Sequence, residues 1–242
     1  MEKIDVIIPL LKNGSKHNDL ELRYALRSIE KYLTNYRDIY IVADYQPEWL
    51  QGVTIVYLGD SLTKTKNIKR KIEACLDISD ISNEVLFTND DIFLLKGMDA
   101  TKYPYYYSTT AQQKIADRDN RDIYKRIMLD TDRVLCESGV EDFKYFDIHK
   151  PIRYDRIMFN HIMSNYDWNN RYGYLIKSLY GNHINADLID VHDNVFDFPI
   201  KESKELVNLN NHDCFSLHSK AIDKTMIDIL ECLYPNKSKY EL

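Results

Sequence analysis

The run Ile4-Asp5-Val6-Ile7-Ile8-Pro9 is the stretch from which the fold can be worked out. It is short, almost wholly apolar and ended by a proline, which is typical of a buried strand in a parallel sheet. A polar turn follows, and apolar residues then recur every three or four positions as far as Leu33, which predicts an amphipathic helix. Asn18 or Asp19 is expected to cap this helix, with Glu21 completing a capping box.

The alternation of strand and helix continues to about residue 99. Ranges 39–42, 53–58 and 85–88 are short apolar runs that predict three further strands, and range 68–76 predicts a helix before the last of them. This order favours an α/β fold with a largely parallel sheet. Beyond residue 99 a strand is expected at 103–107, and helices are expected at 121–136, 154–163, 172–180 and 221–234. Because no linker-like stretch or repeat interrupts the chain, we interpret residues 1–242 as a single domain.

Composition excludes several classes of protein. The net charge is -6 and no Lys/Arg-rich block occurs, which disfavours extensive contact with nucleic acid. The four cysteines are far apart, and no run approaches the roughly 18 apolar residues that a membrane span needs. We therefore expect a cytoplasmic protein without a membrane span. The motifs of serine hydrolases, P-loop NTPases and dinucleotide-binding enzymes are also absent from the sequence.

An acidic motif, Asn89-Asp90-Asp91, directly follows the predicted strand 85–88 and precedes another apolar run. In open α/β sheets, ligands bind beyond the carboxyl ends of the strands. Two carboxylates and an amide at such a place suit Mg²⁺ or Mn²⁺, which proteins bind through one or two carboxylates together with substrate phosphates. A solvated turn is the alternative interpretation in a chain with 38 acidic residues.

Several segments of the chain, in order, resemble the Stealth family of sugar-phosphate transferases, which includes bacterial capsule polymerases and the lysosomal-enzyme N-acetylglucosamine-1-phosphotransferase. The matching segments are Ile4-Asp5-Val6, Asn18 to Tyr32, Ile39 to Val42, Pro47 to Leu50, Phe87 to Asp91, Ile148 to Pro151, Lys177 to Asn182 and Tyr234 to Glu241. The sequence departs from the family pattern at Leu10 to Gly14, at Lys177, where an arginine is usual, and at Ser216 to His218.

The resemblance implies a glycosyltransferase-A-like fold that binds a nucleoside-diphosphate sugar. Residues 1–99 would form the half that binds this donor, and residues 100–242 the half that binds a glycan acceptor. Asp91, with Asp90 and Asn89 beside it, is the expected ligand of Mg²⁺ or Mn²⁺ or of the diphosphate. The expected nucleotide-sugar-binding residues also include Asp5, Asn18, Arg23 and Arg27, although one of the two arginines could instead pair with Glu21 or Glu30.

His149 and Lys177 are the remaining candidates for catalytic roles, beside Asp91. A histidine can take a proton from an acceptor hydroxyl because its pKa lies near working pH, and Asp147 is a candidate to orient its ring. Lys177 could hold phosphate charge, less effectively than the fork of an arginine. The alternatives are a core or capping histidine and a solvated lysine. His192, His212, Asp213 and His218 match no zinc spacing and are interpreted as scattered surface residues.

Three functions remain open. In sugar-phosphate transfer the acceptor attacks the β-phosphorus and a nucleoside monophosphate leaves; this route is favoured by the resemblance. In glycosyl transfer to a cell-surface or phage acceptor, the anomeric carbon is attacked and a nucleoside diphosphate leaves. The third hypothesis is a non-catalytic carbohydrate-binding module.

Overall fold

The computed structural model describes residues 2–11, 17–200 and 208–242. At its centre is a sheet with strand order β4-β3-β1-β5-β9, in which the first four strands are parallel and β9 is antiparallel to β5. The five strands are β1 (Ile4–Pro9), β3 (Tyr36–Ala43), β4 (Thr54–Tyr57), β5 (Glu84–Phe87) and β9 (Ile152–Asp155). The predicted α/β fold with a largely parallel sheet is therefore confirmed.

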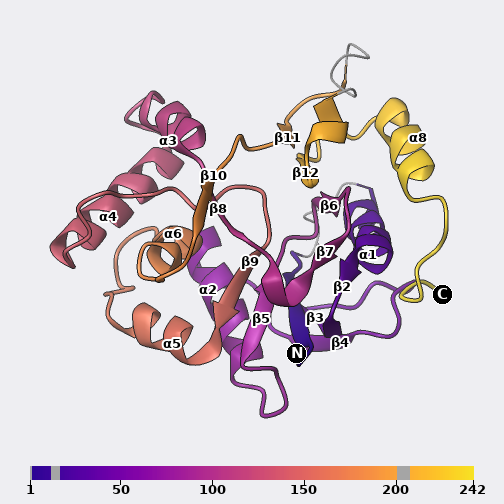
Figure 1. The fold of residues 1–242 in the computed structure, drawn as a ribbon, viewed down its shortest axis with the longest axis horizontal. Helices are drawn as coiled ribbons and strands as arrows, with labels where there is room; N and C mark the ends of the chain where they lie inside the picture. Colours follow the sequence, from indigo (N-terminus) through magenta and orange to yellow (C-terminus); the bar gives the residue numbers. More distant parts are fainter. Residues whose placement is uncertain (1, 12–16, 201–207) are drawn as a thin grey trace.

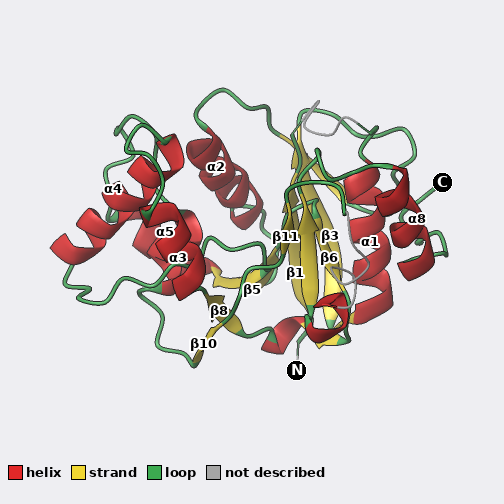
Figure 2. Ribbon diagram, turned by 90° about the horizontal axis from the view of Figure 1, so that it is seen from above, coloured by secondary structure: helices red, strands yellow, loops and turns green. Residues whose placement is uncertain are grey.

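Helices cover both faces of this sheet (Figures 1 and 2). On one face lie α1 (Leu20–Tyr32) and α8 (Lys224–Leu233); on the other lie α2 (Lys64–Leu76), α5 (Arg156–Ser164) and α6 (Ile176–Gly181). The side chains of β1 alternate between the two layers, as the pleat of a strand requires. Val6 and Ile8 pack with Leu22 of α1, whereas Ile7 packs with Ile72 of α2. This explains why almost every residue of β1 is apolar.

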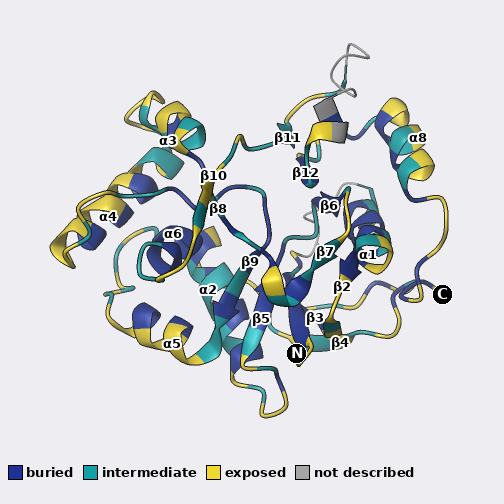
Figure 3. Ribbon diagram, in the orientation of Figure 1, coloured by how far each residue is buried: buried dark blue, intermediate teal, exposed yellow. Residues whose placement is uncertain are grey.

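Two smaller layers extend from the central sheet. One is a three-stranded sheet in the order β11-β12-β6, and the other pairs β10 with β8 beside the α3–α4 helices. In Figure 3 these outer helices each expose one side, whereas the central strands are buried. Within the described residues, no helix is both long and apolar enough to cross a bilayer. The remaining elements are β2 (Leu33–Thr34), β6 (Ile92–Leu94), β7 (Met98–Asp99), η1 (Ala100–Lys102), β8 (Tyr105–Tyr107), α3 (Thr109–Ala116), α4 (Ile123–Glu137), β10 (Leu188–Asp190), β11 (Val195–Phe196), η2 (Asn208–Asn211) and β12 (Cys214–Leu217).

The structure corrects three local expectations. The segment expected to be helical from residue 154 begins instead as strand β9, and α5 starts at Arg156. The segment expected to be helical from residue 172 becomes α6 only at Ile176, because Gly173 has a φ of +86° that a helix does not tolerate. The predicted capping box does not form. Asp19 occupies the N-cap position with a left-handed backbone, and its side chain accepts a hydrogen bond from the Tyr45 hydroxyl (2.7 Å) instead.

The order of the strands creates a crevice beside β1. From β1 the chain passes through α1 to β3 on one side, and it later returns from β4 through α2 to β5 on the other side. At such a reversal the connections diverge above the carboxyl ends of the strands, and ligands of α/β proteins bind there. Strands from both expected halves build the surroundings, since β9 pairs with β5 and β12 pairs with β6.

Asp5 lies at the opposite end of β1 from this crevice and is fully buried. Its carboxylate accepts hydrogen bonds from Arg37 Nε (2.9 Å) and from the backbone N–H groups of Asp38 (3.2 Å) and Ser82 (2.8 Å). The structure thus places Asp5, a predicted nucleotide-binding residue, away from the crevice and among partners of its own. Four residues of extended chain, about 13 Å, separate it from the end of the strand at Pro9, and its carboxylate instead joins β1 to β3 and to the loop before β5.

Replacing Asp5 by alanine should lower the free energy of unfolding by about 2–3 kcal/mol, because four N–H groups of Arg37, Asp38 and Ser82 lose a charged acceptor while Arg37 can still turn to solvent. Urea denaturation would measure this as a lower midpoint with an unchanged slope. The matched control is Asp38→Ala, which removes an exposed partner of the same arginine and should change stability by less than about 0.5 kcal/mol. Equal midpoints for the two variants would contradict this account of Asp5.

Candidate functional site

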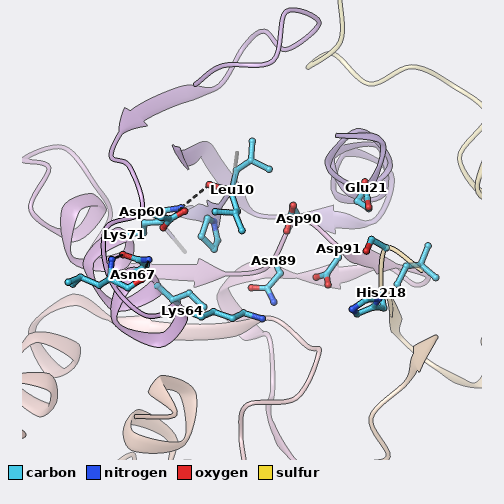
Figure 4. Close-up of a pocket in the computed structure, with 16 residues that line it drawn as sticks. Leu10, Glu21, Asp60, Lys64, Asn67, Lys71, Asn89, Asp90, Asp91 and His218 are labelled. Carbon is cyan, nitrogen blue, oxygen red and sulfur yellow. Dashed lines mark hydrogen bonds and ion pairs between the residues drawn. The ribbon is translucent and has the colours of Figure 1, made fainter. Parts of the chain in front are cut away.

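A cavity of about 580 Å³ occupies the crevice at the carboxyl ends of β1 and β5 (Figure 4). Its walls come from the first turns of α1 and α2, from the loop after β4 and from the end of β12. The residues that line it are Pro9, Leu10, Leu11, Glu21, Asp60, Leu62, Lys64, Asn67, Ile68, Lys71, Asn89, Asp90, Asp91, Leu217, His218 and Ser219. The structure thus places the predicted acidic motif in a cavity.

The acidic wall of the cavity is formed by the motif after β5 together with Glu21 of α1. Oδ1 of Asp91 is buried and has no hydrogen-bond partner among the described residues. The pKa of Asp90 is raised above its ordinary value, first by burial and then by the charges of Asp91 and Glu21. Carboxylates crowded together with an unsatisfied oxygen fit a divalent cation, which would neutralise the repulsion between them.

Few side chains on this wall could act as ligands of a metal ion. Within the described ranges, no three His, Cys, Asp or Glu side chains come together as a metal-binding group. An ion held by Asp90 and Asp91 would therefore take its remaining ligands from water and from substrate oxygens. Mg²⁺ is bound in this way in many enzymes that act on phosphates.

The opposite wall is basic and was missed by the sequence analysis. Nζ of Lys71 is buried and donates hydrogen bonds to the Leu10 carbonyl (2.8 Å) and to the Asp60 carboxylate, which ties the loops after β1 and β4 together. Lys64 is the first residue of α2, is exposed and extends toward Asn89 (Figure 4). The start of a helix also carries unpaired N–H groups and a partial positive charge. The available signal was the run at 64–71, in which five of eight residues are Lys or Arg and which begins shortly after the predicted strand 53–58. The expectation that the chain holds no Lys/Arg-rich block overlooked this run.

His149 is held by a carboxylate that the sequence did not point to. Its ring Nδ1 lies 2.8 Å from Oδ2 of Asp193, and its backbone N–H donates to Oδ1 of the same residue (3.0 Å). Burial lowers the pKa of His149, but the hydrogen bond and charge of Asp193, with a smaller contribution from Asp91, outweigh it and leave the pKa above its ordinary value. The expectation that Asp147 orients the ring is wrong, because that carboxylate accepts hydrogen bonds from the backbone and hydroxyl of Ser178 (2.8 and 2.7 Å).

Lys177 is buried rather than solvated. Its Nζ donates to the backbone carbonyls of Ile148 (2.9 Å) and Lys150 (2.7 Å), one on each side of His149. Burial lowers the pKa of Lys177, against the opposing charges of Asp147 and other acids. Two of its three donors are thus used to hold the loop that carries His149, which leaves one for a phosphate.

Three other predicted donor-binding residues do not line the cavity. Asn18 is exposed just before α1. Arg27 makes a two-pronged contact with Glu241 (2.7 and 2.8 Å), and Arg23 lies 3.7 Å from the same carboxylate and over the ring of Trp49. Arg23 and Arg27, which were predicted to bind the nucleotide, attach the segment around Glu241 to α1 in this structure. Neither pairs with Glu21 or Glu30 in a salt bridge that the described residues show.

Two segments in which the sequence departs from the family pattern, at 10–14 and at 216–218, can be compared with the structure. Lys12 to Gly14 lie outside the described residues. His218 lines the cavity, and its Nδ1 accepts a hydrogen bond from the backbone N–H of Lys220 (3.2 Å), so it is not a surface residue remote from the site. The Leu217 N–H donates to the Asp91 carbonyl (3.2 Å), which brings the end of β12 to the acidic motif.

Comparison with known proteins finds matches for the region that contributes Glu21, Lys64 and the acidic motif to the cavity. The family model for conserved region 2 of Stealth proteins matches residues 16–115, which run from the start of α1 through the acidic motif to α3. An exopolysaccharide phosphotransferase of Streptomyces coelicolor is 34% identical over 93 residues, which cover 34% of this chain and 10% of that protein. The chain thus matches about a tenth of the length of this relative. On these matches, residues 16–115 are similar to a conserved region of the Stealth family.

Proposed function

We propose that this chain is a metal-dependent transferase that moves a sugar-1-phosphate from a nucleoside-diphosphate sugar to a hydroxyl of a glycan acceptor. The observation that carries the proposal is the cavity at the end of β1 and β5, with a pair of carboxylates on one wall and the exposed Lys64 at a helix start on the other. The match to conserved region 2 of Stealth proteins and the phosphotransferase name of the Streptomyces relative support the same reaction class. We also propose that the sheet corresponds to a glycosyltransferase-A-like fold.

The two walls of the cavity match the two needs of a diphosphate. Asp91 and Asp90 would hold Mg²⁺ or Mn²⁺, which when bound supplies a Lewis acid that neutralises the diphosphate oxygens. Across the cavity, Lys64 and the N–H groups that begin α2 offer hydrogen-bond donors to the same charge. Lys71, already paired with Asp60, shapes this wall instead of binding the substrate.

The acceptor side of the reaction would use His149. Its Nε2 takes the proton of the acceptor hydroxyl as the hydroxyl oxygen bonds to the β-phosphorus of the donor. The bond from this phosphorus to the bridging oxygen breaks, and the nucleoside monophosphate leaves with that oxygen. Neither His149 nor Lys177 is among the residues that line the cavity. The charge of Asp91 contributes to the raised pKa of His149, which supports a base placed beside the diphosphate site. Lys177, beneath the histidine loop, has one remaining donor for the phosphoryl oxygens that gain charge.

The nucleotide product tests the reaction class. Incubation with a panel of UDP-, GDP- and CMP-sugars, an oligosaccharide acceptor and Mn²⁺ should release a nucleoside monophosphate from a diphosphate donor, as detected by chromatography. Release of UDP or GDP with transfer of the sugar would show glycosyl transfer instead. Absence of binding of any nucleotide by calorimetry, with and without Mn²⁺, would favour a non-catalytic module.

Replacing Asp91 by asparagine should reduce turnover roughly 10³-fold, because a metal ion contributes several kcal/mol to stabilising the developing charge. The melting temperature should not fall, since the substitution removes repulsion between neighbouring carboxylates. EDTA should abolish wild-type activity, and Mn²⁺ should restore it. As a control, Asp228→Asn on the exposed side of α8 should leave both measurements unchanged. Full activity of the Asp91 variant in EDTA would remove the metal from the mechanism.

Replacing Lys64 by alanine should raise the KM for the donor about tenfold, which corresponds to the loss of one charge-assisted hydrogen bond to phosphate. Stability should be unaffected because the side chain is exposed. Lys224→Ala provides a matched control, since Lys224 is also an exposed lysine at the first position of a helix but lies outside the cavity lining. Initial rates measured over a range of donor concentrations give the KM of each variant. Equal KM values for the two variants would contradict the binding of phosphate by Lys64.

A further inference from the structure

We infer that Asp193 is the positioning residue for His149, selecting the ring tautomer in which Nε2 is free to take the acceptor proton. This inference rests on the proposed function, because it assigns His149 the role of base. The contact between Asp193 and His149 itself does not depend on any substrate. Asp193 follows β10, 44 residues from His149 along the chain. It lies outside every segment of the sequence that resembles the family pattern.

The contact between the two residues determines which nitrogen carries the proton. An ionised carboxylate only accepts hydrogen bonds, so the atom facing Oδ2 of Asp193 across 2.8 Å must be an N–H at Nδ1. In a neutral imidazole the other nitrogen, Nε2, then carries the lone pair. Oδ1 of Asp193 also accepts the backbone N–H of His149 (3.0 Å), so both oxygens serve one residue. Such a bidentate contact determines both the tautomer and the direction of the ring.

The backbone beneath the ring is restrained from the other side. Lys177 binds the carbonyls before and after His149, at Ile148 and Lys150, and is itself buried. The His149 carbonyl also lies near Sγ of Cys214 on β12 (3.8 Å). The main chain is therefore restrained by α6 and β12 and the ring by Asp193. A histidine held only as part of the core would not need its ring nitrogen paired with a carboxylate while its side chain remains 39% exposed.

The charged groups around His149 predict how its titration responds. Asp193 and Asp91 raise its pKa, whereas burial and Lys177 lower it. Removing the charge of Asp193 removes the largest contribution that raises the pKa of His149, so this pKa should fall. A base is active when unprotonated, so the acidic limb of the rate profile should move to lower pH in Asp193→Asn. The maximal rate should fall as well, because an asparagine amide can donate to Nδ1 and so put the proton on Nε2.

The test combines NMR of ¹⁵N-histidine-labelled protein with kinetics on UDP-N-acetylglucosamine, an oligosaccharide acceptor and Mn²⁺. Wild-type His149 should show the Nδ1–H tautomer and a pKa above 6.5. In Asp193→Asn the resonances should show the Nε2–H tautomer and a lower pKa, and kcat should fall roughly 10²- to 10⁴-fold while the KM for the donor stays within twofold. Asp197→Asn, an exposed carboxylate four residues further on, is the matched control and should change none of these quantities.

Two results would overturn the inference. One is a wild-type His149 with the proton on Nε2, a measurement that does not depend on any variant folding. The other is an Asp193→Asn protein with unchanged tautomer and titration. Both are read without turnover, so they are distinct from a failure of the proposed function, which would appear as no release of nucleotide from any donor by a wild-type protein with the expected tautomer.

Discussion

The parallel pairing of β1 with both β3 and β5 is the constraint on which the rest of the structure depends. Because β1 has a neighbour on each side, the chain must leave it in one direction and return on the other. The connections must then separate above Pro9. That separation opens the cavity, brings the starts of α1 and α2 to face each other and places the segment after β5 between them. The polar residues of the site are thus positioned by a packing requirement of apolar strands.

Much of the first hundred residues could be predicted because the deciding signals are local. Each central strand is a short apolar run, and Leu22, Leu26 and Ile29 mark the buried side of α1 at helical spacing. The place of Asp90 and Asp91 followed from a general rule about the ends of parallel strands. The same rule argues against a role of Asp5 in nucleotide binding, because Asp5 is at the other end of its strand. That role was suggested by the family resemblance and not by the direction of the strand.

The pairings between distant residues could not be predicted. Nothing near Arg27 indicates that its partner is Glu241, 214 positions away, and local spacing favoured Glu30 instead. The same holds for Asp193, one of many acidic residues in the chain, which meets His149 through the path of the segment after β10. Periodicity also misplaced the start of the helix near residue 154, because alternation in a strand and spacing in a helix coincide over two or three residues. Lys64 could have been predicted as a basic residue at the start of a helix. Hydrophobic periodicity does not reveal such a residue.

The pairing of β5 with β9 has a consequence for how the chain acquires its structure. Residues 1–99 contain every parallel strand of the central sheet, yet without Ile152 to Asp155 the outer side of β5 would expose unpaired N–H and C=O groups. β6 would similarly lack β12, more than a hundred residues away. Open sheet edges recruit other chains, and contacts between distant residues form late because loop closure must precede them. A partly synthesised chain would therefore have two unpaired sheet edges for as long as the later strands are missing. Aggregation is favoured most during this interval, and chaperones would be most needed then.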